Sequence, residues 1–180
     1  MIITFYSQFE CMATNSVATF ESSLRNLNIR CTRTTPDGFT EALSESIEPP
    51  AVGVPLDIDD ISFEKISVTL SPSSEQLMNA KTGITPAALG VAAQGSLLLQ
   101  SSPKGTEPVS LYPPRHVAVV RESDIVPDIR NALEWLDDEF ADGRRSAVFA
   151  TGVSATGDMG ALVEGVHGPA ATCVIIVEDR

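Results

Sequence analysis

Histidine, cysteine and lysine are scarce in this 180-residue sequence, and each shortage removes a class of site. Two histidines, without a His-x-x-x-His pair, are too few for a typical all-histidine metal site. Cys11, Cys31 and Cys173 form an odd set without a Cys-x-x-Cys pair, which argues against a disulfide framework and against a self-contained iron–sulfur or zinc site. We therefore expect reduced, mostly buried thiols, and no metal or cofactor in this chain.

Long apolar runs are also missing. No stretch reaches the roughly 18 residues that a membrane span needs. The start, Met1 to Cys11, lacks a basic region followed by an apolar one, so it does not predict a secretory signal. We expect residues 1–11 to be a poorly anchored extension, and residues 12–180 to be one cytoplasmic domain, because 43% hydrophobic content suffices for a single core.

Positive charge is the next shortage. The net charge is −12, with 24 acidic residues against 12 basic ones, of which only three are lysines. Such a surface repels nucleic acid and anionic membrane. An acidic, lysine-poor composition also suits a cytoplasm of very high salt, where screening removes the self-repulsion. We hypothesise a halophilic source; the alternative is an ordinary acidic cytosolic protein.

Apolar patterns alternate between helical spacing and short continuous runs. Helices are predicted at about residues 16–27, 35–47, 71–80, 125–140 and 158–163, and strands at 29–33, 51–55, 66–70, 95–100, 109–111, 116–120, 147–150 and 172–177. The loop at 101–107 is expected to turn a hairpin into the strand at 109–111. This alternation predicts a three-layer α/β domain with a largely parallel sheet and helices on both faces, and a β-rich middle at 83–120.

A loop rich in glycine and hydroxyl groups follows the strand at 147–150, which is expected to be buried. From Thr151 and Gly152 it runs through Ser154 and Thr156 to Asp158, before the helix expected at 158–163. Free backbone N–H groups, the hydroxyls and the helix end would suit a phosphate or carboxylate. The alternative is helix capping by Ser154 or Thr156, with Asp158 in the first turn. The loop is neither a P-loop nor a Gly-x-Gly-x-x-Gly turn.

Both histidines lie at candidate site positions. His167 precedes Gly168 in a Gly-Val-His-Gly-Pro turn, and its imidazole could act as base, donor or ligand near pH 7, or could hold the turn by bonding the backbone. His116 follows Arg115 at the mouth of a strand. The two are either strand-edge residues or binders of an acidic substrate. No Gly-x-Ser-x-Gly element is present, so the residues alone assign no catalytic group.

Three blocks, taken together, resemble the LUD domain family, and specifically its lactate-utilisation protein C type. The first runs from Ile84 through an alanine-rich stretch to Leu99, the second from Pro114 to Pro127, and the third from Thr151 to Pro169. The resemblance covers about residues 80–180. The third block is the most specific, because two unusual motifs recur there at the right separation.

The resemblance implies a NagB/RpiA/CoA-transferase-like fold, and a role in oxidising L-lactate to pyruvate. Iron–sulfur clusters are then expected on partner subunits, and this chain would handle an anionic small molecule. Gln94 replaces an acidic residue that family members often have, which speaks against a glutamyl-thioester mechanism. Pro86 and Val153 also depart from the family pattern. The alternatives are an independent enzyme or binding protein for a sugar-phosphate or CoA-ester ligand, and a structural partner without a ligand.

Overall fold

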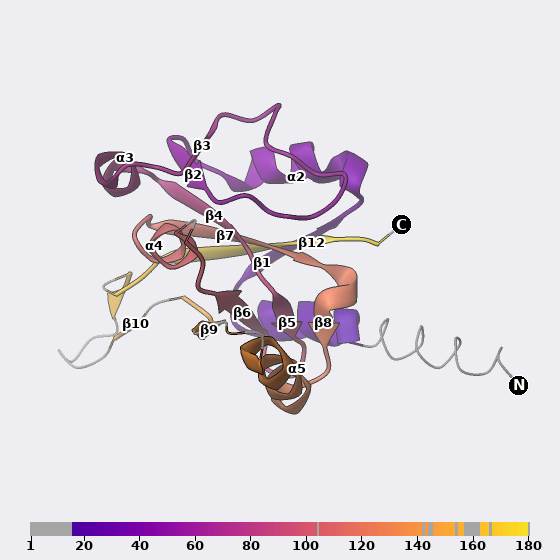
Figure 1. The fold of residues 1–180 in the computed structure, drawn as a ribbon. Helices are drawn as coiled ribbons and strands as arrows, with labels where there is room; N and C mark the ends of the chain where they lie inside the picture. Colours follow the sequence, from indigo (N-terminus) through magenta and orange to yellow (C-terminus); the bar gives the residue numbers. More distant parts are fainter. Residues whose placement is uncertain are drawn as a thin grey trace, which may run out of the picture.

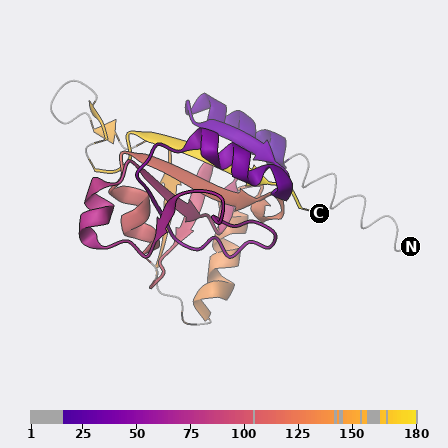
Figure 2. The same cartoon turned by 90° about the horizontal axis from the view of Figure 1, so that it is seen from above.

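A parallel six-stranded sheet forms the centre of the protein (Figures 1 and 2). The computed structural model describes residues 16–103, 105–141, 143, 146–153, 155–156, 163–165 and 167–179. The strand order is β1-β12-β7-β4-β2-β3, and every neighbouring pair is parallel. The strands are β1 (Arg30–Thr34), β2 (Ala51–Gly53), β3 (Val68–Leu70), β4 (Thr82–Pro86), β7 (Arg115–Arg121) and β12 (Ala171–Val177).

A second, smaller sheet is formed by the middle of the chain. Its order is β8-β5-β6-β9, with β5 paired antiparallel to β6 and β6 antiparallel to β9. The strands are β5 (Leu89–Val91), β6 (Ser96–Gln100), β8 (Ile125–Val126) and β9 (Ala147–Thr151). A separate short antiparallel pair joins β10 (Ala155–Thr156) to β11 (Val163–Glu164). The predicted β-rich middle is thus confirmed.

Helices cover both sheets. Residues 16–26 are helical, and α2 (Phe39–Ser46), α3 (Ser74–Asn79), α4 (Thr106–Leu111) and α5 (Ile129–Ala141) follow, with short 3₁₀ turns η1 (Pro36–Gly38) and η2 (Glu122–Asp124). Local sequence explains two of the starts. Thr35 accepts from the Gly38 amide ahead of α2, and Ser73 forms a reciprocal capping box with Gln76 at α3.

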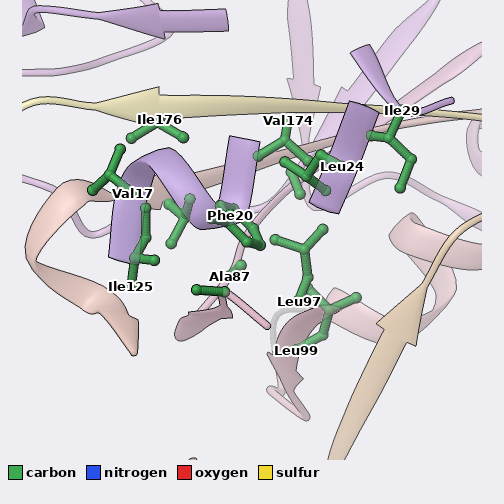
Figure 3. Packing of buried hydrophobic residues seen from close by; sticks show 13 residues of the cluster. Val17, Phe20, Leu24, Ile29, Ala87, Leu97, Leu99, Ile125, Val174 and Ile176 are labelled. Atoms are coloured by element: carbon green, nitrogen blue, oxygen red, sulfur yellow. The ribbon is translucent and has the colours of Figure 1, made fainter. Parts of the chain in front are cut away.

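Alternating side chains on β7 and β12 face two different cores, as the period of a strand requires. The first core lies between the large sheet on one side and the helix at 16–26 and the small sheet on the other (Figure 3). It contains Val17, Phe20, Leu24, Leu97, Leu99, Ala118, Val120, Val174 and Ile176. The second core lies between the large sheet and α2, and it contains Phe39, Leu43, Val117, Val119, Cys173 and Ile175. The large sheet therefore has helices on both faces, as predicted.

The small sheet has its own cover. Ala132 and Leu136 of α5 pack on Leu89, Val91 and Leu98, on the side of the small sheet away from the helix at 16–26. Figure 1 shows the resulting order, with α2 beyond one face of the large sheet, and the helix at 16–26, the small sheet and α5 beyond the other. The domain is α/β with a parallel sheet and an added mixed sheet.

Four expectations of local structure were wrong. Residues 106–111 form α4, where a strand at 109–111 was expected. Ile125 and Val126 form β8, and α5 begins only at Ile129. The strand β9 is not buried, since it lies at the edge of the small sheet and Val148 is 48% exposed.

The fourth concerns only the end of the helix expected at 158–163. Val163 stands in β11, where the helix at 158–163 was expected to end. The rest of that helix, and the extension at residues 1–11, lie outside the described residues.

Candidate functional site

A cavity of about 210 Å³ lies where the beginnings of β7 and β12 approach β6, β9 and α4. Most of its wall is apolar, with Leu97 and Leu99 from β6, and Val148 and Ala150 from β9. A few polar side chains converge on the same space: Glu107, Ser110, His116, Thr151, His167 and Thr172. An apolar pocket with a few placed polar groups is the usual form of a small-molecule site.

Five predicted site residues meet in this cavity although they come from separate parts of the chain. His116 lies near the start of β7, Thr151 ends β9 and is followed by Gly152, and His167 and Gly168 precede β12. The parallel pairing of β7 with β12 explains part of this convergence, because His116 is the register partner of Thr172.

Arg115 does not join them. On a strand, neighbouring side chains point to opposite faces. Arg115 accordingly lies on the α2 side, where its Nη2 is 2.5 Å from Glu48 Oε1 and its Nη1 donates to Cys173 Sγ at 3.7 Å. Its Nε is buried and has no hydrogen-bond partner among the described residues. The expectation that Arg115 and His116 act on one ligand is therefore not met by their placement.

His116 is only 3% exposed, and its Nε2 lies 2.9 Å from Thr85 Oγ1. Burial lowers the pKa of His116 from about 6.5 to about 4. The ring is therefore neutral near pH 7. The Thr85 hydroxyl can donate to Nε2 or accept from it, depending on which tautomer the neutral ring adopts. His116 can offer the cavity a donor or an acceptor, but no positive charge.

Thr151 is held by a hydroxyl pair. Its Oγ1 lies 2.5 Å from Ser96 Oγ, and the two residues are register partners in β6 and β9. Gly152 follows with φ +77°, a left-handed conformation that glycine adopts without strain, and the chain turns away from the sheet there.

The other predicted residues of this loop are not fully described. Ser154 and Asp158 lie outside the described residues, and Thr156 belongs to β10, with its side chain undescribed. The described part of this segment pairs β10 with β11. The helix end expected to hold an anion falls on residues outside the described part of the chain, so that expectation stays a prediction.

Four polar residues of the site were missed by the sequence interpretation as site residues: Thr85, Glu107, Ser110 and Thr172. A signal existed for Thr172, because it opens the last strand just as His116 opens β7. Glu107 and Ser110 gave none, since their segment was taken for a loop and strand. Within α4, Ser110 Oγ donates to the Glu107 carbonyl at 2.8 Å. From the loop before α4, Ser101 Oγ donates to the Glu107 carboxylate.

Neither a metal cluster nor a membrane span is found in the part of the chain that the structure describes. Its residues contain no group of three histidine, cysteine or acidic side chains placed to hold a metal ion. Its helices include none with the length and apolarity to cross a bilayer. From the described lining residues, the cavity has hydroxyls, one carboxylate and two imidazoles.

Comparison with known proteins gives the family. The LUD domain model matches residues 67–177. Lactate utilization protein C of Bacillus licheniformis is 37% identical over 105 residues, which are 56% of this chain and 44% of that protein. The Macrococcus caseolyticus protein of the same name is 29% identical over 164 residues, 82% of this chain and 71% of that one.

The fold agrees with a solved structure. A DUF162 family protein from Deinococcus radiodurans superposes with a TM-score of 0.73 at 22% identity, covering 92% of this chain and 98% of that one. Against several curated relatives the chain spans about half of their length. Because the family model accounts for more than half of the sequence, this homologue of lactate utilization protein C belongs to the LUD domain family.

Proposed function

We propose that this chain is a component of an L-lactate utilisation system, and that the cavity beside His116 and His167 binds L-lactate or its oxidation product, pyruvate. The observation that carries the proposal is the convergence of both histidines and Thr151 on one small, mostly apolar cavity. The similarity to relatives named lactate utilization protein C supports the choice of pathway.

The cavity suits a small 2-hydroxy acid. Lactate combines a methyl group, a hydroxyl and a carboxylate. Leu97 and Leu99 would receive the methyl group, and the hydroxyl of Thr151 would bond the carboxylate. His116 is neutral and cannot supply a counter-charge, so the proposal gives the carboxylate a hydrogen bond from the imidazole of His167, which is exposed at the cavity.

Size favours this ligand over the alternatives. Pockets for drug-sized ligands usually have volumes of about 300–1,000 Å³. At about 210 Å³ the cavity is smaller, which favours a three-carbon acid over a sugar phosphate or a CoA ester. Oxidising lactate to pyruvate removes two electrons and two protons. The proposal assigns the two electrons to oxidised iron–sulfur clusters on partner subunits, the hydroxyl proton to an imidazole of this chain, and the proton from the lactate Cα to solvent.

Growth on L-lactate tests the role in the cell. Deleting the gene should abolish growth on L-lactate and leave growth on glucose intact, and the wild-type gene should restore it. His167→Ala should restore growth poorly, while Lys65→Ala, an equally exposed change outside the cavity, should restore it fully. Normal growth of the deletion strain on L-lactate would refute the pathway assignment.

Binding to the purified chain tests the ligand. Calorimetry should detect L-lactate or pyruvate binding to the wild-type and Lys65→Ala proteins, and a clear weakening in His167→Ala. Tight binding of CoA or of a sugar phosphate at the His167 cavity, without binding of L-lactate, would instead support the independent-enzyme alternative.

A further inference from the structure

A second and larger cavity, of about 540 Å³, lies at the other end of the parallel sheet. Three parallel strands end at its wall: Val54 follows β2, Pro86 ends β4 and Arg121 ends β7. In open α/β sheets, ligands characteristically bind in the crevice beyond the carboxyl ends of the strands. Position and volume both suit a small-molecule site.

This cavity is separate from the histidine cavity. The two share no lining residue. On β7, His116 lines one and Arg121 lines the other; five residues at the rise of a strand place their Cα atoms roughly 16 Å apart. The two cavities are therefore distinct sites, although Ser101 of the larger one donates to the Glu107 carboxylate of the other.

Groups that both donate and accept hydrogen bonds dominate the polar lining. Gln100, Ser101 and Ser102 follow one another where β6 ends, and Thr106 opens α4. Ser102 Oγ and Thr106 Oγ1 lie 2.8 Å apart, which leaves each hydroxyl capacity for a further bond. A ligand hydroxyl, itself a donor and an acceptor, complements such groups.

The charges of the lining disfavour an anion. Among the lining residues that the structure describes, Arg121 is the one cation and Asp57 and Asp124 are the two carboxylates, so their formal charge is −1. The guanidinium is held at the wall by a 3.1 Å bond from Arg121 Nη2 to the Asp57 carbonyl. Burial raises the pKa of Asp124, with Arg121 opposing and Asp179 adding to the effect. A phosphorylated ligand would meet this excess of negative charge within a chain whose net charge is −12.

Trp135 of α5 completes the wall, and it is the only tryptophan of the chain. Its ring is partly buried against the core of the small sheet, so it presents a fixed, flat apolar surface. We propose that this cavity binds an uncharged, polyhydroxylated small molecule of the sugar or polyol class, with its C–H face on Trp135 and its hydroxyls on the Gln100–Ser102 segment, Thr106 and the charged pair.

Trp135 fluorescence provides the test, because no other tryptophan contributes. D-Glucose, D-ribose, myo-inositol and glycerol are titrated into the whole chain, with D-glucose 6-phosphate and L-lactate as anionic comparisons. At least one neutral compound should give a saturable change, and the two anions none. Asp124→Asn and Ser102→Ala should each weaken that binding about tenfold, as the loss of one good hydrogen bond would.

The control is Asp137→Asn, the same change at an exposed position of α5, which should bind as the wild type does. Thermal unfolding of each variant verifies that it is folded. If one of the two cavity variants does not fold, the other alone is enough for the test. The proposal is overturned if no neutral compound gives a saturable change, if an anion binds at Trp135 in preference, or if the control weakens binding as much as the cavity variants do.

Discussion

Arg115 and His116 show how far adjacent residues can diverge. In the sequence they read as one polar pair at the mouth of a strand. The alternation of β7 sends Arg115 to Glu48 on one side of the sheet and His116 to Thr85 and the cavity on the other. The histidine was predictable as a site residue because it opens a buried strand. Its partner Thr85 was not, since the contact depends on the pairing of β4 with β7, which a single sequence does not reveal.

Burial of His116 predicts a pH dependence of stability. Its pKa is about 4 in the folded chain and near 6.5 when unfolded, so between these values the unfolded chain binds more protons. The contribution is present above pH 6.5 and is lost as the pH falls toward 4. The free energy of unfolding, from urea titrations, should fall by about 2 kcal/mol more between pH 7 and pH 5 in the wild type than in His116→Gln.

Comparing the two proteins cancels the titration of the carboxylates that both contain. The chain has only two histidines, so NMR of ¹⁵N-labelled imidazoles can follow His116 directly, and its ring should remain neutral at pH 5. Parallel stability curves for the two proteins, or a His116 ring that protonates near pH 6.5, would contradict the prediction.

At the scale of elements, the helices and strands that could be predicted are those whose burial imposes a clear spacing of apolar residues along the sequence. The apolar runs of β7 and β12 and the helical stripe at residues 16–26 pack as their patterns indicate. The helix α4 was missed because Gly105 and Pro108 look like turn residues. Proline is tolerated in the first turn of a helix, and Val109 packs with Val52 and Val54 to stabilise a helix that local propensity would not form. Tertiary contact, invisible in one sequence, decides such short elements.

The close approach of α4 to β4 depends on Gly83. A Cβ there would lie 1.9 Å from the Val109 carbonyl oxygen, a backbone atom that can move only with α4. Gly83→Ala should therefore lower the free energy of unfolding by about 2–3 kcal/mol, as overpacking does. It should also weaken lactate binding, because α4 carries Glu107 and Ser110 into the cavity.

The matched control is Gly38→Ala. Its added Cβ would meet Thr34 Oγ1 at 2.6 Å, but that side chain can rotate away, so less than about 1 kcal/mol should be lost. Urea unfolding of both variants beside the wild type measures the difference. Equal stability of Gly83→Ala and Gly38→Ala would mean that the packing of α4 on β4 does not require glycine.

At the scale of the whole molecule, two electrostatic effects on stability have opposite signs. Repulsion within a net charge of −12 destabilises the fold, and a few exposed ion pairs stabilise it. Arg33 lies 2.7 Å from Glu122 and 3.0 Å from Glu178, joining the end of β1 to the segments after β7 and β12. Exposed pairs of this kind contribute about 0–1 kcal/mol each. Salt weakens these pairs, but it also screens the repulsion among the excess carboxylates, and the larger of the two effects sets the sign of the response.

Repulsion should dominate, since 24 acidic residues face 12 basic ones. The free energy of unfolding, from urea titrations at increasing KCl, should therefore rise with salt, and KCl avoids the added stabilisation that sulfate gives by exclusion from the surface. Arg33→Ala makes the net charge more negative by one and removes the two ion pairs of Arg33, which salt weakens. The stability of this variant should therefore increase more steeply with KCl than that of the wild type. If the wild-type chain is fully stable in dilute buffer and its free energy of unfolding does not change with KCl, adaptation to high salt is ruled out as the reason for this composition. Screening of the carboxylates would then add no stability to the fold.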